Sequence, residues 1–193
     1  MSRSEATPRG VARPFDLRPK KTGARDAAVL CLHGLTGTPY EVLPVAEALV
    51  ARGLRARGPW MAGHEGGHEV LARTPSTEWV ALAEAELARL RAEHERVFLV
   101  GISMGGLVAL RLAQIAPVDA LAVIGVPLGL PSHRRLLARL LRPILPYLAK
   151  RGSDIRDPAA RSGHPGLVAM PLAAVVELKI GRASCRERVY HPV

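Results

Sequence analysis

Short apolar runs alternate along the chain with longer stretches in which apolar residues recur every three or four positions. Near-continuous apolar runs are typical of parallel strands buried on both faces, and the recurring pattern is typical of helices. The predicted strands span residues 27–32, 53–59, 97–100 and 119–127, with a short extra strand near 15–17. The predicted helices span 39–52 and 76–96, and a third follows residue 103. This alternation predicts an α/β fold with a doubly wound, mostly parallel sheet covered by helices on both faces.

The run Val97–Val100 leads directly into Gly101-Ile102-Ser103-Met104-Gly105 and then into a helical pattern. This order predicts a strand, a sharp turn and a helix, with Ser103 at the apex in a strained backbone conformation. A Cβ atom at Gly101 or Gly105 would collide where strand and helix approach each other. We therefore interpret Ser103 as a candidate nucleophile whose Oγ is lifted clear of the sheet.

The same letters also fit an ordinary turn in which Ser103 caps the helix, because serine is a preferred N-cap residue. A second motif favours the nucleophile. The segment AAVLCLHGLTGTP, residues 27–39, is a buried-strand pattern that ends in His33-Gly34. An acyl-transfer serine needs two N–H donors for the oxyanion, one from the next residue and one from the loop after an earlier strand. Met104 and Leu35 occupy those positions.

The motifs HGLTGTP and GISMGG, with PWMAGHEGGH between them, resemble the α/β-hydrolase superfamily, and most closely its bacterial carboxylesterase and monoacylglycerol lipase branch. The branch is also described as serine aminopeptidase-like or lysophospholipase. The resemblance implies an α/β-hydrolase core over 25–128, after a loose arm over 1–24, and a helical cap over 129–179. It implies hydrolysis of a small carboxylic ester by Ser103, without metal or cofactor. The residues implied as support for the oxyanion hole are His33, Gly34, Gly101 and Gly105.

Other functions on the same fold stay open. A peptidase, a thioesterase or an acyltransferase would use the same serine, and a non-catalytic homologue would keep only the pocket.

The stretch from Ser132 to Arg151 is amphipathic, and Pro143 and Pro146 are expected to kink or split it. Its apolar side carries Leu136, Leu137, Leu140, Leu141, Ile144, Leu145 and Leu148, whereas Arg134, Arg135, Arg139 and Arg142 lie towards the other side. In the family this position holds a cap over the active site, which suits an acyl chain. The alternatives are a surface helix packed on the core and a basic helix lying on a membrane surface.

Composition and charge limit the classes of binding partner that we expect. The 193 residues suffice for one domain with one core. The net charge of +10 suggests an anionic partner. However, nearly all of the 27 basic residues are Arg in a chain rich in Ala, Gly, Pro and Leu, which indicates coding bias. No Arg cluster is interleaved with aromatic residues, so we expect no nucleic-acid binding. No secretory signal or long apolar run is evident, so the expected location is cytoplasmic.

The segment 60–74 contains His64 and His68, each followed by a glutamate. Histidines four residues apart bind metals when they lie on a helix. Gly63, Gly66 and Gly67 argue against a helix, so we predict a loop without a metal site. The family resemblance implies a packing and hydrogen-bonding role for His64.

A serine nucleophile needs a histidine base and an orienting carboxylate, which in this fold follow the serine on loops after later strands. The candidates Asp154, Asp157, His133, His164 and His191 do not follow apolar strands. The segment IGRASCRERVY, from residue 180, instead matches a translated sequencing adapter. We therefore expect residues 180–193 to be an artefactual tail, and the fold to lack the last strands that would carry the acid and the base.

Overall fold

The computed structural model describes residues 13–20, 26–128, 132–150 and 166–180. The expected N-terminal arm lies outside these ranges except for residues 13–20, and the expected tail lies outside them except for Ile180.

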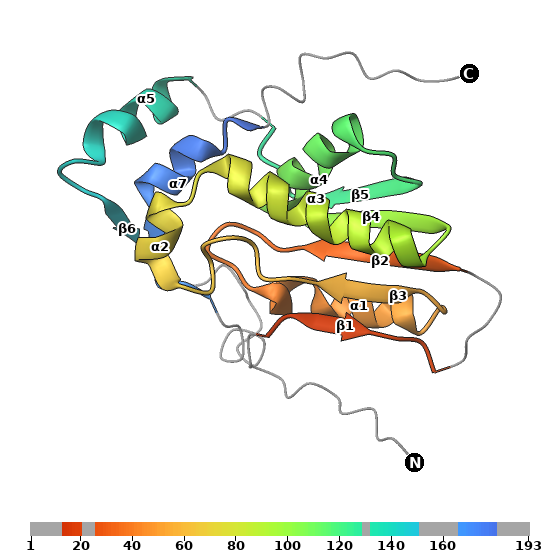
Figure 1. The fold of residues 1–193 in the computed structure, drawn as a ribbon. Helices are drawn as coiled ribbons and strands as arrows, with labels where there is room; N and C mark the ends of the chain where they lie inside the picture. The colour runs from red at the N-terminus through yellow and green to blue at the C-terminus, as the bar shows by residue number, and fades with distance from the viewer. Residues whose placement is uncertain (1–12, 21–25, 129–131, 151–165, 181–193) are drawn as a thin grey trace.

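A five-stranded sheet with the order β1-β3-β2-β4-β5 forms the centre of the fold (Figure 1). Its strands are β1 (Phe15–Leu17), β2 (Ala27–Leu32), β3 (Arg55–Gly58), β4 (Arg96–Ile102) and β5 (Ala120–Ile124). Strands β3, β2, β4 and β5 run parallel to one another. Strand β1 pairs antiparallel with β3 at the edge of this sheet. The predicted mostly parallel α/β sheet is therefore confirmed.

Strand β2 is apolar throughout because helices cover both faces of the sheet. Its side chains alternate between two cores, as the pleat of a strand requires. Leu30 and Leu32 belong to a core with helices α3 (Ser76–Glu93) and α4 (Met104–Ile115). Val29 and Cys31 belong to a second core with helix α1 (Leu43–Val50). In Figure 1, α3 and α4 lie on one side of the sheet and α1 lies on the other.

Two predicted helices differ from the structure at their ends. The predicted helix 39–52 consists of a 3₁₀ turn, η1 (Pro39–Val42), followed by α1. The predicted helix 76–96 is α3, which ends at Glu93 and has Pro75 at its N-cap position. Ser76 donates its N–H and Oγ–H to Glu177 Oε2, at 3.0 and 2.7 Å. A carboxylate from far along the chain thus binds the N-terminus of α3, where the helix dipole favours negative charge.

The prediction of a loop over 60–74 is wrong in part, because helix α2 spans Gly67–Arg73. Gly67 begins the helix with φ +80°, a conformation that glycine adopts without strain. Leu71, on this helix, is fully buried, so packing against the core stabilises a helix that the glycines disfavour. His64 lies in the turn before α2 and His68 lies on it, so the two are not on one helix face.

The region after β5 contains α5 (Ser132–Leu141), a two-stranded antiparallel sheet of β6 (Tyr147–Ala149) and β7 (Ala169–Pro171), and α7 (Leu172–Glu177). The predicted helix 132–151 is split: α5 ends before Pro143, and residues after Pro146 form β6. In the later part of the expected cap region, β7 leads directly into α7. In Figure 1, α2, α5, β6 and α7 gather at the end of the sheet to which β2 and β3 point.

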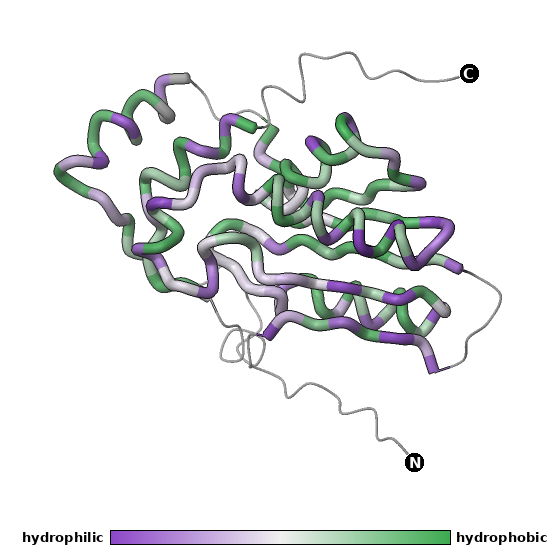
Figure 2. The backbone as a smooth tube through the Cα atoms, viewed as in Figure 1, coloured by the Kyte–Doolittle hydropathy of each residue, from purple (hydrophilic) through white to green (hydrophobic). Residues whose placement is uncertain are grey.

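Helix α5 packs on α7 through Ala138, which forms a small buried cluster with Leu172 and Val176. The leucine stripe of α5 does not join the cores of the described residues: Leu140 is 63% exposed, and Ile144, just beyond the helix, is 84% exposed. Apolar and polar segments alternate along α5 in Figure 2. Among the described residues, no helix is both long and apolar enough to cross a membrane.

Candidate active site

Ser103 is the single residue between β4, which ends at Ile102, and α4, which begins at Met104. Its φ of 52° and ψ of −113° lie outside the regions that non-glycine residues favour. An N-cap serine normally has extended dihedral angles and bonds to the helix through its hydroxyl. Within the described residues the Ser103 hydroxyl makes no such capping bond. The geometry therefore favours a strained, half-buried apex over an ordinary cap.

The backbone around Ser103 is held from both sides. Its N–H donates to the carbonyl oxygen of Ile124 in β5 at 2.8 Å, and its own carbonyl accepts from Leu107 N–H at 3.2 Å. Local strain persists only where the surroundings fix it, and these bonds supply that restraint.

Glycines allow strand and helix to meet at this turn. A Cβ atom at Gly105 would lie under 3.0 Å from the carbonyl oxygen of Leu32, and one at Gly101 would lie as close to the carbonyl oxygen of Gly105. Both clashes are with backbone, which cannot swing away. The collision expected from the sequence is present at both positions.

The loop after β2 lies beside the serine. A Cβ atom at Gly34 would lie 3.4 Å from Ser103 Cβ, although the two residues are far apart in sequence. The next residues form a turn in which Gly37 N–H donates to the carbonyl oxygen of Gly34 at 3.1 Å. Leu35 lies in this turn and packs on the core that β2 shares with α3 and α4. Met104 is fully buried at the first position of α4. The first N–H groups of a helix have no partner within the helix.

His33 is fully buried, and both of its ring nitrogens are occupied. Nε2 accepts a hydrogen bond from Met61 N–H, and Nδ1–H donates to the carbonyl oxygen of Gly34, both at 3.0 Å. Burial, helped by the nearby His64 ring, lowers the pKa of His33 to about 3. His33 is therefore neutral and holds the loop, and it is not available to take a proton from Ser103.

His64 packs edge-on against His33, with ring centroids 4.9 Å apart. Its Nδ1–H lies 3.1 Å from the carbonyl oxygen of Ala62, and burial lowers its pKa. His68 points elsewhere and packs against Tyr147, at 4.9 Å between centroids. Within the described ranges, no three His, Cys, Asp or Glu residues form a group suited to a metal ion.

Of the predicted acid and base candidates, only His133 lies in the described residues, where its side chain is exposed at the start of α5. Asp154, Asp157, His164 and His191 lie outside them.

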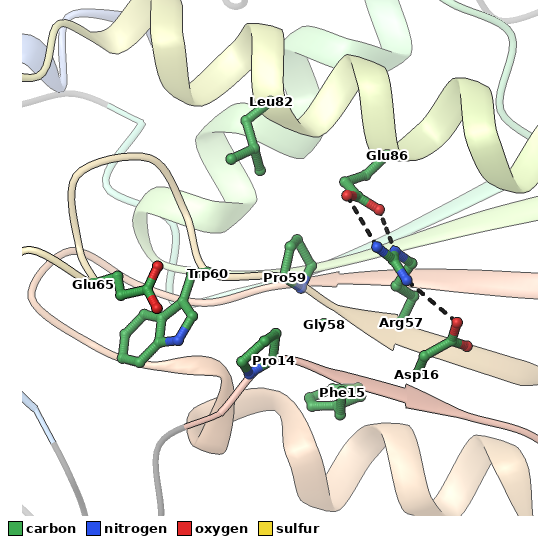
Figure 3. A pocket seen from close by; sticks show the side chains of 10 residues that line it. All are labelled: Pro14, Phe15, Asp16, Arg57, Gly58, Pro59, Trp60, Glu65, Leu82 and Glu86. Carbon is green, nitrogen blue, oxygen red and sulfur yellow. Dashed lines mark hydrogen bonds and ion pairs between the residues drawn. The ribbon is translucent and has the colours of Figure 1, made fainter.

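A pocket of about 400 Å³ lies at the β1 edge of the sheet, and none of the predicted site residues lines it (Figure 3). Arg57 crosses it and pairs with Asp16 on β1 and Glu86 on α3. The neighbouring Arg55 pairs with Asp16 and Glu93 and is only 5% exposed. These ion pairs compensate the charge of the buried Arg55 and attach β1 to the sheet.

The family model described as "Alpha/beta hydrolase family" matches residues 29–188. The chain belongs to the alpha/beta hydrolase family. The chain is 33% identical to the thermostable monoacylglycerol lipase of Bacillus sp. (strain H-257), over 67% of this chain and 52% of that protein. It is 29% identical to a carboxylesterase of Bacillus subtilis (strain 168), over 63% and 48%. The chain thus spans about half the length of these curated relatives.

Solved structures of alpha/beta hydrolases have the same fold. A structure of the metagenome-derived lipolytic enzymes LipS and LipT matches this hydrolase with a TM-score of 0.78 and 23% identity. The match covers 90% of this chain and 69% of that chain.

One polar residue of this alpha/beta hydrolase was not singled out from the sequence. Glu41, in η1, accepts a hydrogen bond from Gly34 N–H at 2.8 Å through Oε2. The pattern Thr38-x-x-Glu41 signals local hydrogen bonding at a helix start. The contact with Gly34 depends on how the whole loop folds.

Proposed function

We propose that the protein is a serine hydrolase of carboxylic esters, of the carboxylesterase or lipase type. The observation that carries the proposal is the strained Ser103 at the strand-to-helix apex, directly beside the Gly34 loop. Ser103 Oγ attacks the ester carbonyl, and the N–H groups of Leu35 and Met104 stabilise the oxyanion. The lipase and carboxylesterase among its relatives support this reaction class.

The base and its orienting acid come, in this proposal, from residues outside the described ranges. His33 is excluded as the base because both of its nitrogens are occupied. The N-terminus of α4 adds its positive dipole end at Ser103, which favours the negative charge that develops during attack.

The substrate we propose is an ester with an apolar acyl chain, presented at a lipid surface. The exposed leucines of α5 supply an apolar face, and the segment 132–150 contains basic residues and no carboxylate. A basic amphipathic helix of this kind binds anionic lipid surfaces.

Ser103→Ala tests the reaction. In the full-length gene product, we expect hydrolysis of a p-nitrophenyl ester to fall by about 10³-fold or more, because removing a nucleophile leaves only binding and oxyanion stabilisation. Ser76→Ala is the matched control, because that hydroxyl bonds to Glu177, away from the turn. Ester turnover that survives Ser103→Ala would overturn the assignment.

A substrate panel separates the rival activities on the same fold. Turnover of an anilide faster than that of the ester would indicate a peptidase, and faster turnover of an acyl thioester would indicate a thioesterase. Transfer of the acyl group to an added alcohol would indicate an acyltransferase. A full-length protein that binds esters without turning them over would indicate a non-catalytic homologue.

A further inference from the structure

The carboxylate of Glu41 lies inside the loop that carries Leu35. Its Oε2 accepts the Gly34 N–H at 2.8 Å. A Cβ atom at Gly37 would meet both carboxylate oxygens at less than 3.0 Å, and one at Gly34 would lie 3.1 Å from Oε2. The carboxylate therefore occupies the space that side chains at these two glycines would fill. It acts as a core around which the turn closes.

This turn needs an anchor because its backbone is strained. Thr36 has φ 60°, which is uncommon for a residue with a branched Cβ. Such conformations persist only where neighbouring contacts fix them. A hydrogen bond from a backbone N–H to a carboxylate is about twice as strong as a neutral one.

We infer that Glu41 is a positioning residue for the oxyanion hole: its carboxylate holds the Gly34–Gly37 turn so that the Leu35 N–H stays directed at Ser103. This inference rests on the proposed ester hydrolysis. Glu41 itself does not touch the reacting atoms in this role.

The segment that leads into β7 also contacts this turn. Leu167 N–H donates to the carbonyl oxygen of Thr36 at 2.9 Å, and Lys150 N–H donates to that of Val168 at 3.1 Å. The Lys150 ammonium is attracted by the charge of Glu41, which opposes the lowering of the Lys150 pKa by partial burial. A positive charge beside Glu41 reduces the repulsion that this carboxylate would exert on a nearby oxyanion.

The experiment compares Glu41→Ala and Glu41→Gln in the full-length gene product. Glu47→Ala is the matched control, because it removes an exposed glutamate from the adjacent α1. We expect Glu41→Ala to lower kcat by about tenfold to a hundredfold, because small displacements of catalytic groups are costly. KM should stay within about twofold of the wild-type value, since the Leu35 N–H acts mainly in the transition state. Glu41→Gln should recover part of kcat, because its amide oxygen still accepts the Gly34 N–H.

Two further measurements separate positioning from general destabilisation. Inhibition by a boronic acid, which forms a tetrahedral adduct on the serine, should weaken in step with kcat in Glu41→Ala. Amide hydrogen exchange of Gly34 and Leu35 should accelerate, while exchange in β2 and β4 stays slow. Lys150→Met should lower kcat less than Glu41→Ala does. This loss of kcat should be smaller still when Lys150→Met is introduced into the Glu41→Gln protein.

Unchanged kcat in Glu41→Ala with an active wild type would overturn the inference and leave the proposed function standing. A loss of kcat accompanied by fast exchange throughout β2 and β4 would also overturn it, because Glu41 would then act on the fold as a whole. A full-length wild type without ester turnover would overturn the proposed function, and the positioning role with it.

Discussion

His33 shows how a residue of the predicted motif serves the site without taking part in proton transfer. Its two hydrogen bonds connect the start of the Gly34–Gly37 turn to the Met61 backbone after β3. An imidazole with both nitrogens occupied in a buried place resists protonation, because the charged form would lose a partner and remain desolvated.

This predicts a pH dependence of stability. The pKa of His33 is about 3 in the folded protein and about 6.5 in an unfolded chain. Protons therefore bind the unfolded state more tightly, so stability is fully present above about pH 6.5 and falls as the pH is lowered towards 3. The lowered pKa of His64 acts in the same direction. We expect His33 to contribute up to about 1.4 kcal/mol per pH unit in this range.

Denaturant unfolding between about pH 4.5 and 6.5 checks this. The range excludes most of the titration of Asp16 and Glu177, whose pKa values lie below their ordinary 3.8 and 4.5. His33→Asn should reduce the slope of the unfolding free energy against pH in this range. An equal slope in wild type and His33→Asn would contradict the argument.

Two adjacent glycines of α4 provide a matched test of the turn. Alanine at Gly105 would lie under 3.0 Å from the backbone carbonyl oxygen of Leu32, whereas alanine at Gly106 would approach only the Val126 side chain that closely and would lie 3.2 Å from the nearest backbone oxygen, that of Gly101. Overpacking costs about 1–3 kcal/mol. We expect Gly105→Ala to reach at least the upper end of this range, and Gly106→Ala to cost less, in denaturant unfolding. A larger loss in Gly106→Ala would show that the close approach of β2 and α4 is described wrongly.

At the scale of elements, the local sequence predicts two helix boundaries that distant contacts then support. Helix α3 begins at Ser76, as its pattern predicts, and Glu177 of α7, 101 residues away, binds its first N–H. Helix α5 ends at Leu141 because Pro143 follows, and the chain then pairs as β6 with β7.

The exposed face of α5 predicts binding to anionic lipid. The protein should co-sediment with vesicles that contain phosphatidylglycerol and much less with pure phosphatidylcholine, because the segment 132–150 carries basic and apolar residues without a carboxylate. Leu140→Glu should weaken binding, since it places a negative charge on a side chain that is 63% exposed. Val70→Glu, at another exposed apolar residue, is the control. Equal binding by Leu140→Glu would exclude this face as the contact.

At the scale of the whole molecule, the sheet of the described residues ends in an apolar strand. Strand β5 pairs with β4 on one side, and Ile124 is 50% exposed. An edge strand with exposed apolar side chains invites pairing with other chains.

We therefore expect the exposed edge of β5 to promote self-association of the protein. Ile124→Lys should shift the protein towards monomer in analytical ultracentrifugation, because a charge at an edge opposes strand pairing. Arg111→Lys, a conservative change on α4, should leave the distribution unchanged. A wild-type chain that remains monomeric at high concentration would contradict this prediction.

The sequence by itself determined the order of strands and helices, the turn at Ser103 and the meeting of that turn with the Gly34 loop. These follow from local rules: apolar runs form buried strands, glycines permit close approach, and parallel strands carry their loops to one end of the sheet. The short β1 strand near Phe15 and the split of the amphipathic stretch at Pro143 were predictable on the same grounds.

Only the tertiary structure decided which polar groups are paired. The burial of Arg55 by Asp16 and Glu93, the contact of Ser76 with Glu177 and the enclosure of the Glu41 carboxylate by the Gly34 loop each join segments whose spacing carries no pattern. A buried polar group takes whichever partner the packed chain brings within reach, because leaving it unpaired costs free energy. Tertiary packing also explains why helix α2 forms although its glycines disfavour a helix. The burial of Leu71 outweighs the low helix propensity of this segment.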